Sequence, residues 1–197
     1  AYSQDEINQL IVDNALTYGH VVRLKGGDSF IFGRGSEEIE FVESFGIPTF
    51  VVPGISSSIA VPASQGISLT KRGVSESFWV ITGTTSARKL STDVALAAQS
   101  TATVVILMGM SKLDEIVALF QNESKGEMPV AIIQNGTTPE EKTGMGTIDT
   151  IQKIVADKNL SSPAIIVIGE VVGDSKRRVC FYKELKSNQK VLAYGKE

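Results

Sequence analysis

Short runs of apolar residues recur along the chain, and most of them end in a turn that contains glycine. In the C-terminal part these strand-like runs are Phe78 to Ile81, Val104 to Met108, Val130 to Gln134 and Ala164 to Ile168. Segments with helical spacing separate them, at Thr92 to Gln99, Lys112 to Gln121 and Ile148 to Lys158. This alternation predicts an α/β fold with a largely parallel or mixed sheet. Because such sheets bind ligands at the carboxyl ends of their strands, function is expected in the loops after the strands.

The N-terminal part opens with a helix signal. Ser3 and Glu6 form a capping-box pattern, apolar residues then keep helical spacing, and Gly19 ends the pattern. A strand, a helix, a second strand and a third helix are expected to follow, which is the rhythm of a βαβ unit. Their expected bounds are Val21 to Lys25, Ser36 to Phe45, Thr49 to Val52 and Ser56 to Gly66, with Pro62 favouring a kink or an early end of the last helix.

The segment from Ile67 to Ser77 is rich in glycine, serine and charge and has no sustained period. We expect a domain boundary there, with a truncated N-terminal α/β domain at 1–70 and a C-terminal α/β domain at 71–197. Only two strands precede the boundary, too few for a stable sheet, so an N-terminal segment is expected to be missing. One continuous sheet fits the pattern equally well. Arg178 to Tyr182 and Val191 to Tyr194 are candidates for added antiparallel edges.

Composition narrows the possible partners. A net charge of −3 gives no global attraction to nucleic acid or to a membrane surface, so an anionic ligand needs a local cluster of Arg and Lys. The apolar runs are too short to cross a bilayer. Cys180 is the only cysteine, which excludes an internal disulfide and a cysteine-built zinc site and suits a reducing compartment, so we expect a cytoplasmic protein. His20 has no partner that suggests metal chemistry, and no metal site is expected.

Two motifs in the N-terminal part suit polar ligands. Gly26-Gly27-Asp28 follows a strand, so a ligand can approach the bare backbone and the carboxylate can accept hydrogen bonds, although a tight turn with an Asp cap explains it as well. In Gly33-Arg34-Gly35-Ser36-Glu37-Glu38, an arginine between glycines can fork onto a carboxylate ligand. For Glu38, an ordinary role as a first-turn acid that complements the helix dipole is the preferred interpretation.

Further turns carry hydroxyls, free amides or cations. The turn Pro53 to Ser57 suits a polar ligand, with plain helix capping as the alternative. Thr70-Lys71-Arg72-Gly73 places two cations beside the expected boundary, where a polyanion or simply solvent can meet them. Met108-Gly109-Met110 and Asn135 to Pro139 each leave a strand. Each turn alone is a weak signal, but their convergence would form one ligand site.

Taken together, these motifs resemble the tetrapyrrole methylase family. The resemblance rests on Val22 to Asp28, Phe30 to Gly35, Val51 to Ile55, Leu69-Thr70, Arg72-Gly73, Asn135 to Pro139 and Ser162 to Val172, and it covers nearly the whole chain in the expected order. Within the family the chain looks most like members that methylate uroporphyrinogen III. The resemblance implies two α/β domains with the active site in the cleft between them, in a homodimer, and not a Rossmann-type methyltransferase.

The resemblance also implies a cofactor and a set of site residues. The cofactor is S-adenosyl-L-methionine, with S-adenosyl-L-homocysteine as product. Residues matching the family's tetrapyrrole-facing and catalytic positions are Arg34, Glu37 and Arg72. Matched cofactor-binding positions are Gly26, Gly27, Asp28, Ile31, Ser56, Ser57, Met108 and Gly136. The chain departs from the family at Ser29 for proline, Ser36 for glycine and Lys71 for histidine, and the family's first Gly-rich strand and loop have no counterpart.

The function so implied is C-methylation of uroporphyrinogen III to precorrin-2, on the way to sirohaem or cobalamin. Family members that act on a later precorrin, on diphthamide or on ribosomal RNA remain alternatives. From another class, a nucleotide-binding module without transfer activity fits the same loops, and so does a fragment that serves only as a scaffold or dimerisation unit. The tetrapyrrole would be the small-molecule partner, with no nucleic acid and no membrane.

Overall fold

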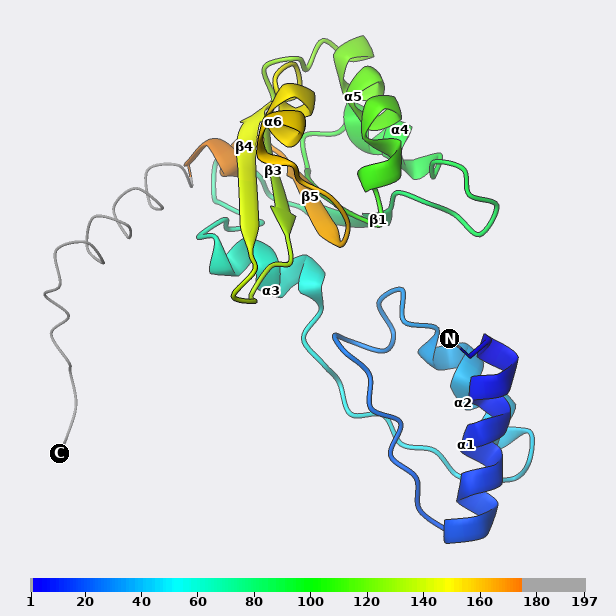
Figure 1. The fold of residues 1–197 in the computed structure, drawn as a ribbon. Coiled ribbons are helices and arrows are strands. Elements are labelled where there is room, and N and C mark those ends of the chain that lie inside the picture. The colour runs from blue at the N-terminus through cyan, green and yellow to red at the C-terminus, as the bar shows by residue number, and fades with distance from the viewer. Residues whose placement is uncertain (1, 175–197) are drawn as a thin grey trace, which may run out of the picture. The chain divides into compact units, whose positions relative to one another are not determined.

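The computed structural model describes residues 2–174 of the chain (Figure 1). Contacts between residues divide it into two units, one running to Ser57 and the other beginning at Ser58. The strand-like ends expected at Arg178 to Tyr182 and Val191 to Tyr194 lie outside the described residues, as does Cys180.

The second unit is built on a five-stranded mixed sheet in the order β1-β2-β5-β3-β4. β1 pairs parallel with β2, whereas β5 pairs antiparallel with both β2 and β3, and β4 pairs antiparallel with β3. The predicted strands are confirmed within a residue or so as β1 (Phe78–Thr82), β2 (Thr103–Leu107), β3 (Pro129–Gln134) and β5 (Ala164–Ile168). The mixed α/β class predicted from the sequence is therefore confirmed.

Strand β4 (Lys142–Thr147) was not predicted, because its sequence is polar and rich in glycine. The glycines have a packing reason. A Cβ at Gly144 would lie 2.8 Å from a methyl of Leu160, and one at Gly146 would lie 2.5 Å from a methyl of Ile154. Side chains at these positions would push away the α6 region that covers the strand.

Helices cover both faces of this sheet (Figure 1). Side chains alternate along each strand, so that Ile106, Ile132 and Ile166 face one helical layer and Val105, Ile133 and Val167 face the other. The first layer holds α4 (Asp93–Gln99), α5 (Leu113–Asn122) and α6 (Ile151–Lys158), with the short 3₁₀ turn η1 (Met110–Lys112) leading into α5. The second contains α3 (Ser57–Ser64), which packs through Val61.

The first unit pairs two helices, α1 (Gln4–Tyr18) and α2 (Gly35–Glu43). The predicted capping box is present: Ser3 and Glu6 exchange backbone-to-side-chain hydrogen bonds, and Gly19 ends the helix at a φ of 79°. Only Val12 and Val42 are buried apolar side chains among the described residues of this unit. Its core is therefore small.

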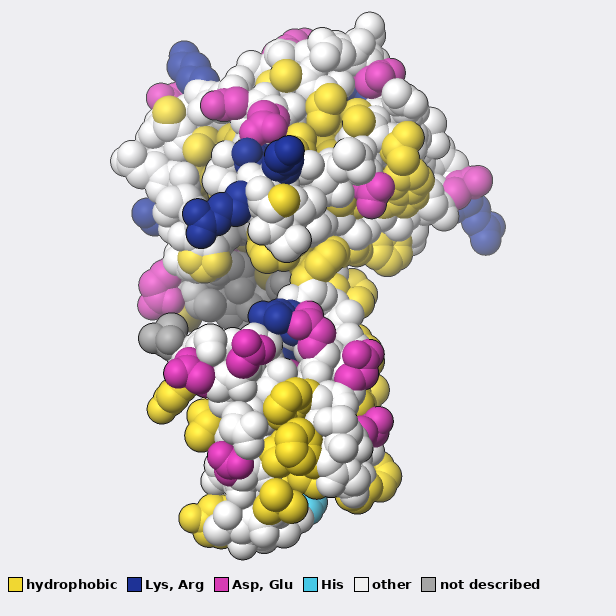
Figure 2. All heavy atoms as spheres, turned by 90° about the vertical axis from the view of Figure 1, so that its right-hand side faces the viewer, with side chains coloured by type: hydrophobic (Ala, Val, Ile, Leu, Met, Phe, Trp, Pro, Cys, Tyr) yellow, Lys and Arg dark blue, Asp and Glu magenta, His cyan; other side chains and the backbone are white. Residues whose placement is uncertain are grey.

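The two strands expected in the first unit are wrong: residues 21–25 and 49–52 are irregular. A strand is stabilised by the hydrogen-bond ladder to a neighbour, and within residues 2–174 no strand pairs with either segment. Their apolar side chains remain in solvent, with Leu24 84% and Phe50 95% exposed. Figure 2 shows apolar side chains on the surface of this unit, which can be found in the picture by the cyan of the chain's one histidine.

The division of the chain lies nearer the N-terminus than the boundary expected between residues 70 and 71. Val61, Ile67 and Leu69 pack against Val105, Ile133 and other side chains of the sheet face that α3 covers. The boundary was expected in residues 67–77 because their composition is polar. Ile67 and Leu69, at the start of this segment, nevertheless pack against the sheet of the second unit. Among the described residues, no helix is long and apolar enough to cross a bilayer.

Candidate functional site

The Gly26-Gly27-Asp28 loop and the Pro53 to Ser57 turn, both predicted to bind ligand, pack on each other in the first unit. The Gly54 amide donates to Asp28 Oδ2 at 3.0 Å, and the Phe30 amide donates to Asp28 Oδ1 at 2.8 Å. A Cβ on Gly54 would lie 2.1 Å from the Gly27 carbonyl oxygen, so only glycine allows this approach. The two loops therefore form one surface, with Asp28 fixing both and retaining lone pairs for a ligand.

Other predicted cofactor residues border this surface. Ile31 is 43% exposed, Ser56 is buried, and Ser57 begins α3. Gly26 is open, because a Cβ built there would meet no atom within 4 Å. This part of the backbone is accessible to a ligand.

Arg34 and Glu37 form an exposed ion pair. Arg34 Nε lies 3.0 Å from Glu37 Oε1, and the side chains are 53% and 52% exposed. The hydrogen bond from Arg34 lowers the pKa of Glu37, and the same contact raises the pKa of Arg34. Glu37 is thus an anion and Arg34 a cation at neutral pH. The exposed guanidinium of Arg34 can turn from Glu37 to a carboxylate ligand.

Close packing fixes the backbone at Arg34. Its φ is 58°, and it lies between Gly33 and Gly35, which have no side chain and so leave room for the Ser29 backbone. A Cβ at either glycine would lie within 2.7 Å of the Ser29 carbonyl oxygen. The Gly35 amide donates to that oxygen at 2.9 Å. The loop therefore presents Arg34 from a fixed backbone.

Glu38 has a structural role. It is 5% exposed, and its Oε1 accepts from Lys25 at 2.9 Å, Gln4 at 3.1 Å and Arg23 at 3.3 Å. Burial alone would raise the pKa of Glu38, but the hydrogen bonds from Lys25 and Gln4 and the two nearby cations lower it further than burial raises it. Glu38 therefore serves the fold, as preferred from the sequence. Its hydrogen-bond partners are side chains from α1 and the 21–25 segment, whereas the sequence suggested only the dipole of its own helix.

In the second unit the loops after β1 and β2 border a cavity of about 560 Å³. Met108, one of the predicted cofactor residues, lines it and is 53% exposed. The other lining residues are Thr84, Thr85, Ser86, Ser111, Ser162, Pro163 and Ala164. Hydroxyl groups beside an apolar methionine suit a ligand with both polar and flat apolar parts.

The loop that carries Gly136 adjoins the same wall. The Asn135 amide donates to the carbonyl oxygen of Pro163 at 3.0 Å. A Cβ on Gly136 would lie 2.4 Å from a methyl of Val61, so glycine lets the loop rest on α3. Glu141 holds the loop from the other side, accepting from the Thr137 amide at 2.7 Å and from Gln65.

Arg72 lies in an exposed turn of the second unit. The turn is closed by backbone bonds between Lys71 and Ser75, and Lys71 pairs with Asp174. Arg72 projects from the same turn and is exposed to solvent. The predicted site residues thus form two groups: Arg72, Met108 and Gly136 in the second unit, and the others, together with Arg34 and Glu37, in the first.

Sequence reasoning missed Thr84, Thr85 and Ser86. The available signal was Gly83, because it follows a strand in the way that Gly109 and Gly136 do. Within residues 2–174, no group of three His, Cys, Asp or Glu side chains is arranged to hold a metal ion.

Comparison with known proteins adds independent evidence. The family described as Tetrapyrrole (Corrin/Porphyrin) Methylases matches residues 1–152. The uroporphyrinogen-III C-methyltransferase of Methanocaldococcus jannaschii is 44% identical over 174 residues, which are 87% of this chain and 72% of that protein. Its counterpart in Synechocystis is also 44% identical, over 86% of this chain and 65% of that protein. This chain thus spans 65–72% of the length of these two relatives.

A solved structure shares the fold. The uroporphyrin-III C-methyl transferase of Thermus thermophilus, crystallised with S-adenyl homocysteine, superposes with a TM-score of 0.74 at 30% identity, over 86% of this chain and 74% of that one. The residues matched by the family include the first unit and most of the second. On the sequence match and the shared fold, the chain belongs to the tetrapyrrole methylase family.

Proposed function

We propose that the chain belongs to an S-adenosylmethionine-dependent methyltransferase that converts uroporphyrinogen III to precorrin-2. The observation that carries the proposal is the exposed Arg34–Glu37 pair, set on a rigid backbone in the same unit as the interlocked loops of Gly27 and Gly54. The named relatives at 44% identity support this substrate over a later precorrin. The product feeds sirohaem or cobalamin synthesis.

The glycine loops fit the cofactor. Open backbone at Gly26 and Gly27 and the carboxylate of Asp28 suit its polar groups, with Ile31, Ser56 and Ser57 beside them. In the second unit, Met108 lines hydroxyl-bearing and apolar surface that suits the flat adenine ring, and the loop of Gly136 is bonded to this wall through Pro163. When bound, S-adenosylmethionine supplies an electrophilic methyl group.

The residues of the chain orient the reaction. A pyrrole carbon forms a bond to the methyl carbon while the carbon–sulfur bond breaks and its electron pair stays on sulfur, which leaves S-adenosylhomocysteine. Alignment of the two reactants can lower such a barrier by about 7–11 kcal/mol. Arg34 and Arg72 bind carboxylates of the tetrapyrrole, and Glu37, an anion at neutral pH, orients the substrate or accepts the ring proton.

The assembly and location belong to the same proposal. The enzyme acts in the cytoplasm as a homodimer and uses neither nucleic acid nor a membrane as partner. The net charge of −3 supports the last point, since it gives no general attraction to polyanions.

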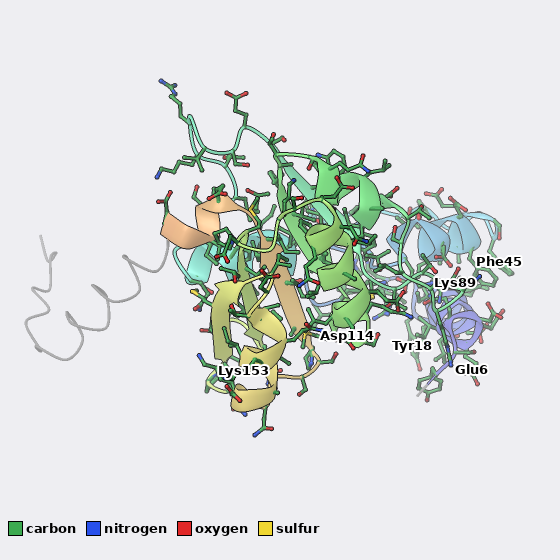
Figure 3. The ribbon with its side chains drawn as sticks, turned by 90° about the horizontal axis from the view of Figure 1, so that it is seen from above. Glu6, Tyr18, Phe45, Lys89, Asp114 and Lys153 are labelled. Atoms are coloured by element: carbon green, nitrogen blue, oxygen red, sulfur yellow. The ribbon has the colours of Figure 1, made fainter. Side chains whose placement is uncertain are left out.

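Arg34→Ala in the full-length protein is expected to lower kcat/KM for uroporphyrinogen III by about 100-fold, because a carboxylate contact that becomes buried on binding is lost. Methyl transfer from labelled S-adenosylmethionine and the product mass measure it. Lys153→Ala is the matched control, since this cation lies on the solvent face of α6 (Figure 3) and its removal should leave turnover unchanged. Unchanged turnover in Arg34→Ala would remove Arg34 from the mechanism.

A further inference from the structure

Met108 has a backbone conformation that needs support from its neighbours. Its φ is 55°, in the left-handed region that residues with a side chain rarely adopt. Such a conformation persists where the surrounding structure holds it, and it recurs at ligand sites. Because Met108 lines the cavity and is half exposed, the conformation decides where its carbonyl group and thioether point.

Thr84 supplies a contact that can hold this conformation. Its hydroxyl donates to the carbonyl oxygen of Met108 at 2.8 Å, from the loop after the neighbouring strand. Thr84 is itself anchored: its amide donates to Thr82 Oγ1 at 3.3 Å, and its carbonyl oxygen accepts from the same hydroxyl at 2.9 Å. The donor therefore sits at a fixed place relative to β1.

The backbones of the two loops touch beside this contact. The Gly83 amide donates to the Leu107 carbonyl oxygen at 2.7 Å. A Cβ on Gly83 would lie 2.4 Å from the Cα of Gly109, the residue after Met108. The end of β1 and the end of β2 are thus joined on both sides of Met108.

We infer that Thr84 is a positioning residue for the methyl donor: its hydroxyl holds Met108 in the left-handed conformation in which Met108 contacts the cofactor. The inference rests on the proposed function and adds a residue to it. Thr84 acts through Met108, so its loss changes the fit of the cofactor and leaves the chemistry of transfer in place.

Thr84→Val in the full-length protein tests this, because valine keeps the shape of threonine and removes the hydroxyl. We expect the Kd for S-adenosylhomocysteine, measured by calorimetry, and the KM for S-adenosylmethionine to rise about five- to tenfold, with kcat nearly unchanged. Thr84→Ser restores the donor and should return both values to within about twofold of the parent. Circular dichroism melting shows whether each variant is folded.

A double-mutant cycle separates positioning from general stability. Glycine adopts a positive φ without strain, so in a Met108→Gly background the loss of the Thr84 hydroxyl should have a smaller effect on Kd than in the parent. Equal binding by parent and Thr84→Val, equal losses in the Val and Ser variants, or additive losses in the cycle would each overturn the inference. A parent protein that fails to bind S-adenosylhomocysteine would overturn the proposed function itself.

Discussion

Gly54→Ala is expected to destabilise the first unit by about 3 kcal/mol or more and to abolish measurable binding of S-adenosylhomocysteine. The added methyl would lie 2.1 Å from the Gly27 carbonyl oxygen and 3.2 Å from the Asp28 Cα, so backbone and not a flexible side chain must move. The Gly54–Asp28 hydrogen bond would be lost in the same movement. Hydrogen exchange of the amides in residues 26–54 measures the change within the first unit.

Gly26→Ala is the matched control for stability. It adds the same methyl in the same pair of loops, but no atom lies within 4 Å of that position, and its φ is not in the positive range. Exchange rates should therefore stay near those of the parent. Equal protection in the Gly54 and Gly26 variants would show that Gly54 does not pack against the Gly27 carbonyl.

Glu38→Ala is expected to destabilise the first unit by about 2–4 kcal/mol, because the mostly buried Lys25 cation loses its carboxylate counter-ion and keeps only the Gly33 carbonyl oxygen as acceptor. Lys25 Nζ is only 2.9 Å from Glu38 Oε1, and the Lys25 side chain is 16% exposed. With Val12 and Val42 as the buried apolar side chains of the described first unit, little other packing compensates. Hydrogen exchange of α1 and α2 amides provides the measurement, and Glu37→Ala, an exposed neighbour, should change it little.

The pH dependence of the first unit follows from the same residue. The pKa of Glu38 is lowered from its ordinary value of 4.5 on folding, so its contribution is fully present above that value. It is lost as the pH falls through the lower pKa of the folded state. Acid unfolding of α1 and α2 should be less steep in Glu38→Gln than in the parent, and identical acid profiles would contradict the role given to Glu38.

The elements that could be predicted are those with a local signal. The capping box of Ser3 and Glu6 marks the start of α1, and the apolar run of Val104 to Met108 was enough to predict the buried strand β2. Strand β4 could not be predicted, because its glycines leave room for side chains of α6 and for Leu160, which lie elsewhere in the sequence. Nothing in the local pattern of β4 indicates a strand. The 21–25 segment has the composition of a strand, but pairing depends on a neighbour that local sequence does not specify.

The site residues, too, could be predicted only where the signal is local in the sequence. Glycines after strands predicted the loops of Met108 and Gly136, since a bare backbone is visible in the sequence. The partner of the Thr84 hydroxyl and the three donors around Glu38 could not be read there, because each comes from a distant part of the chain. Whether a polar residue serves a ligand or the fold depends on those partners.

Because the backbones of Gly83 and Gly109 lie in contact, their amide signals can report together on ligand binding to the second unit. A displacement of one glycine must move the other, because no side chain separates them to absorb it. In a nitrogen-15 nuclear magnetic resonance titration, their two amide signals should therefore shift together, with one midpoint, when a ligand occupies the adjoining cavity.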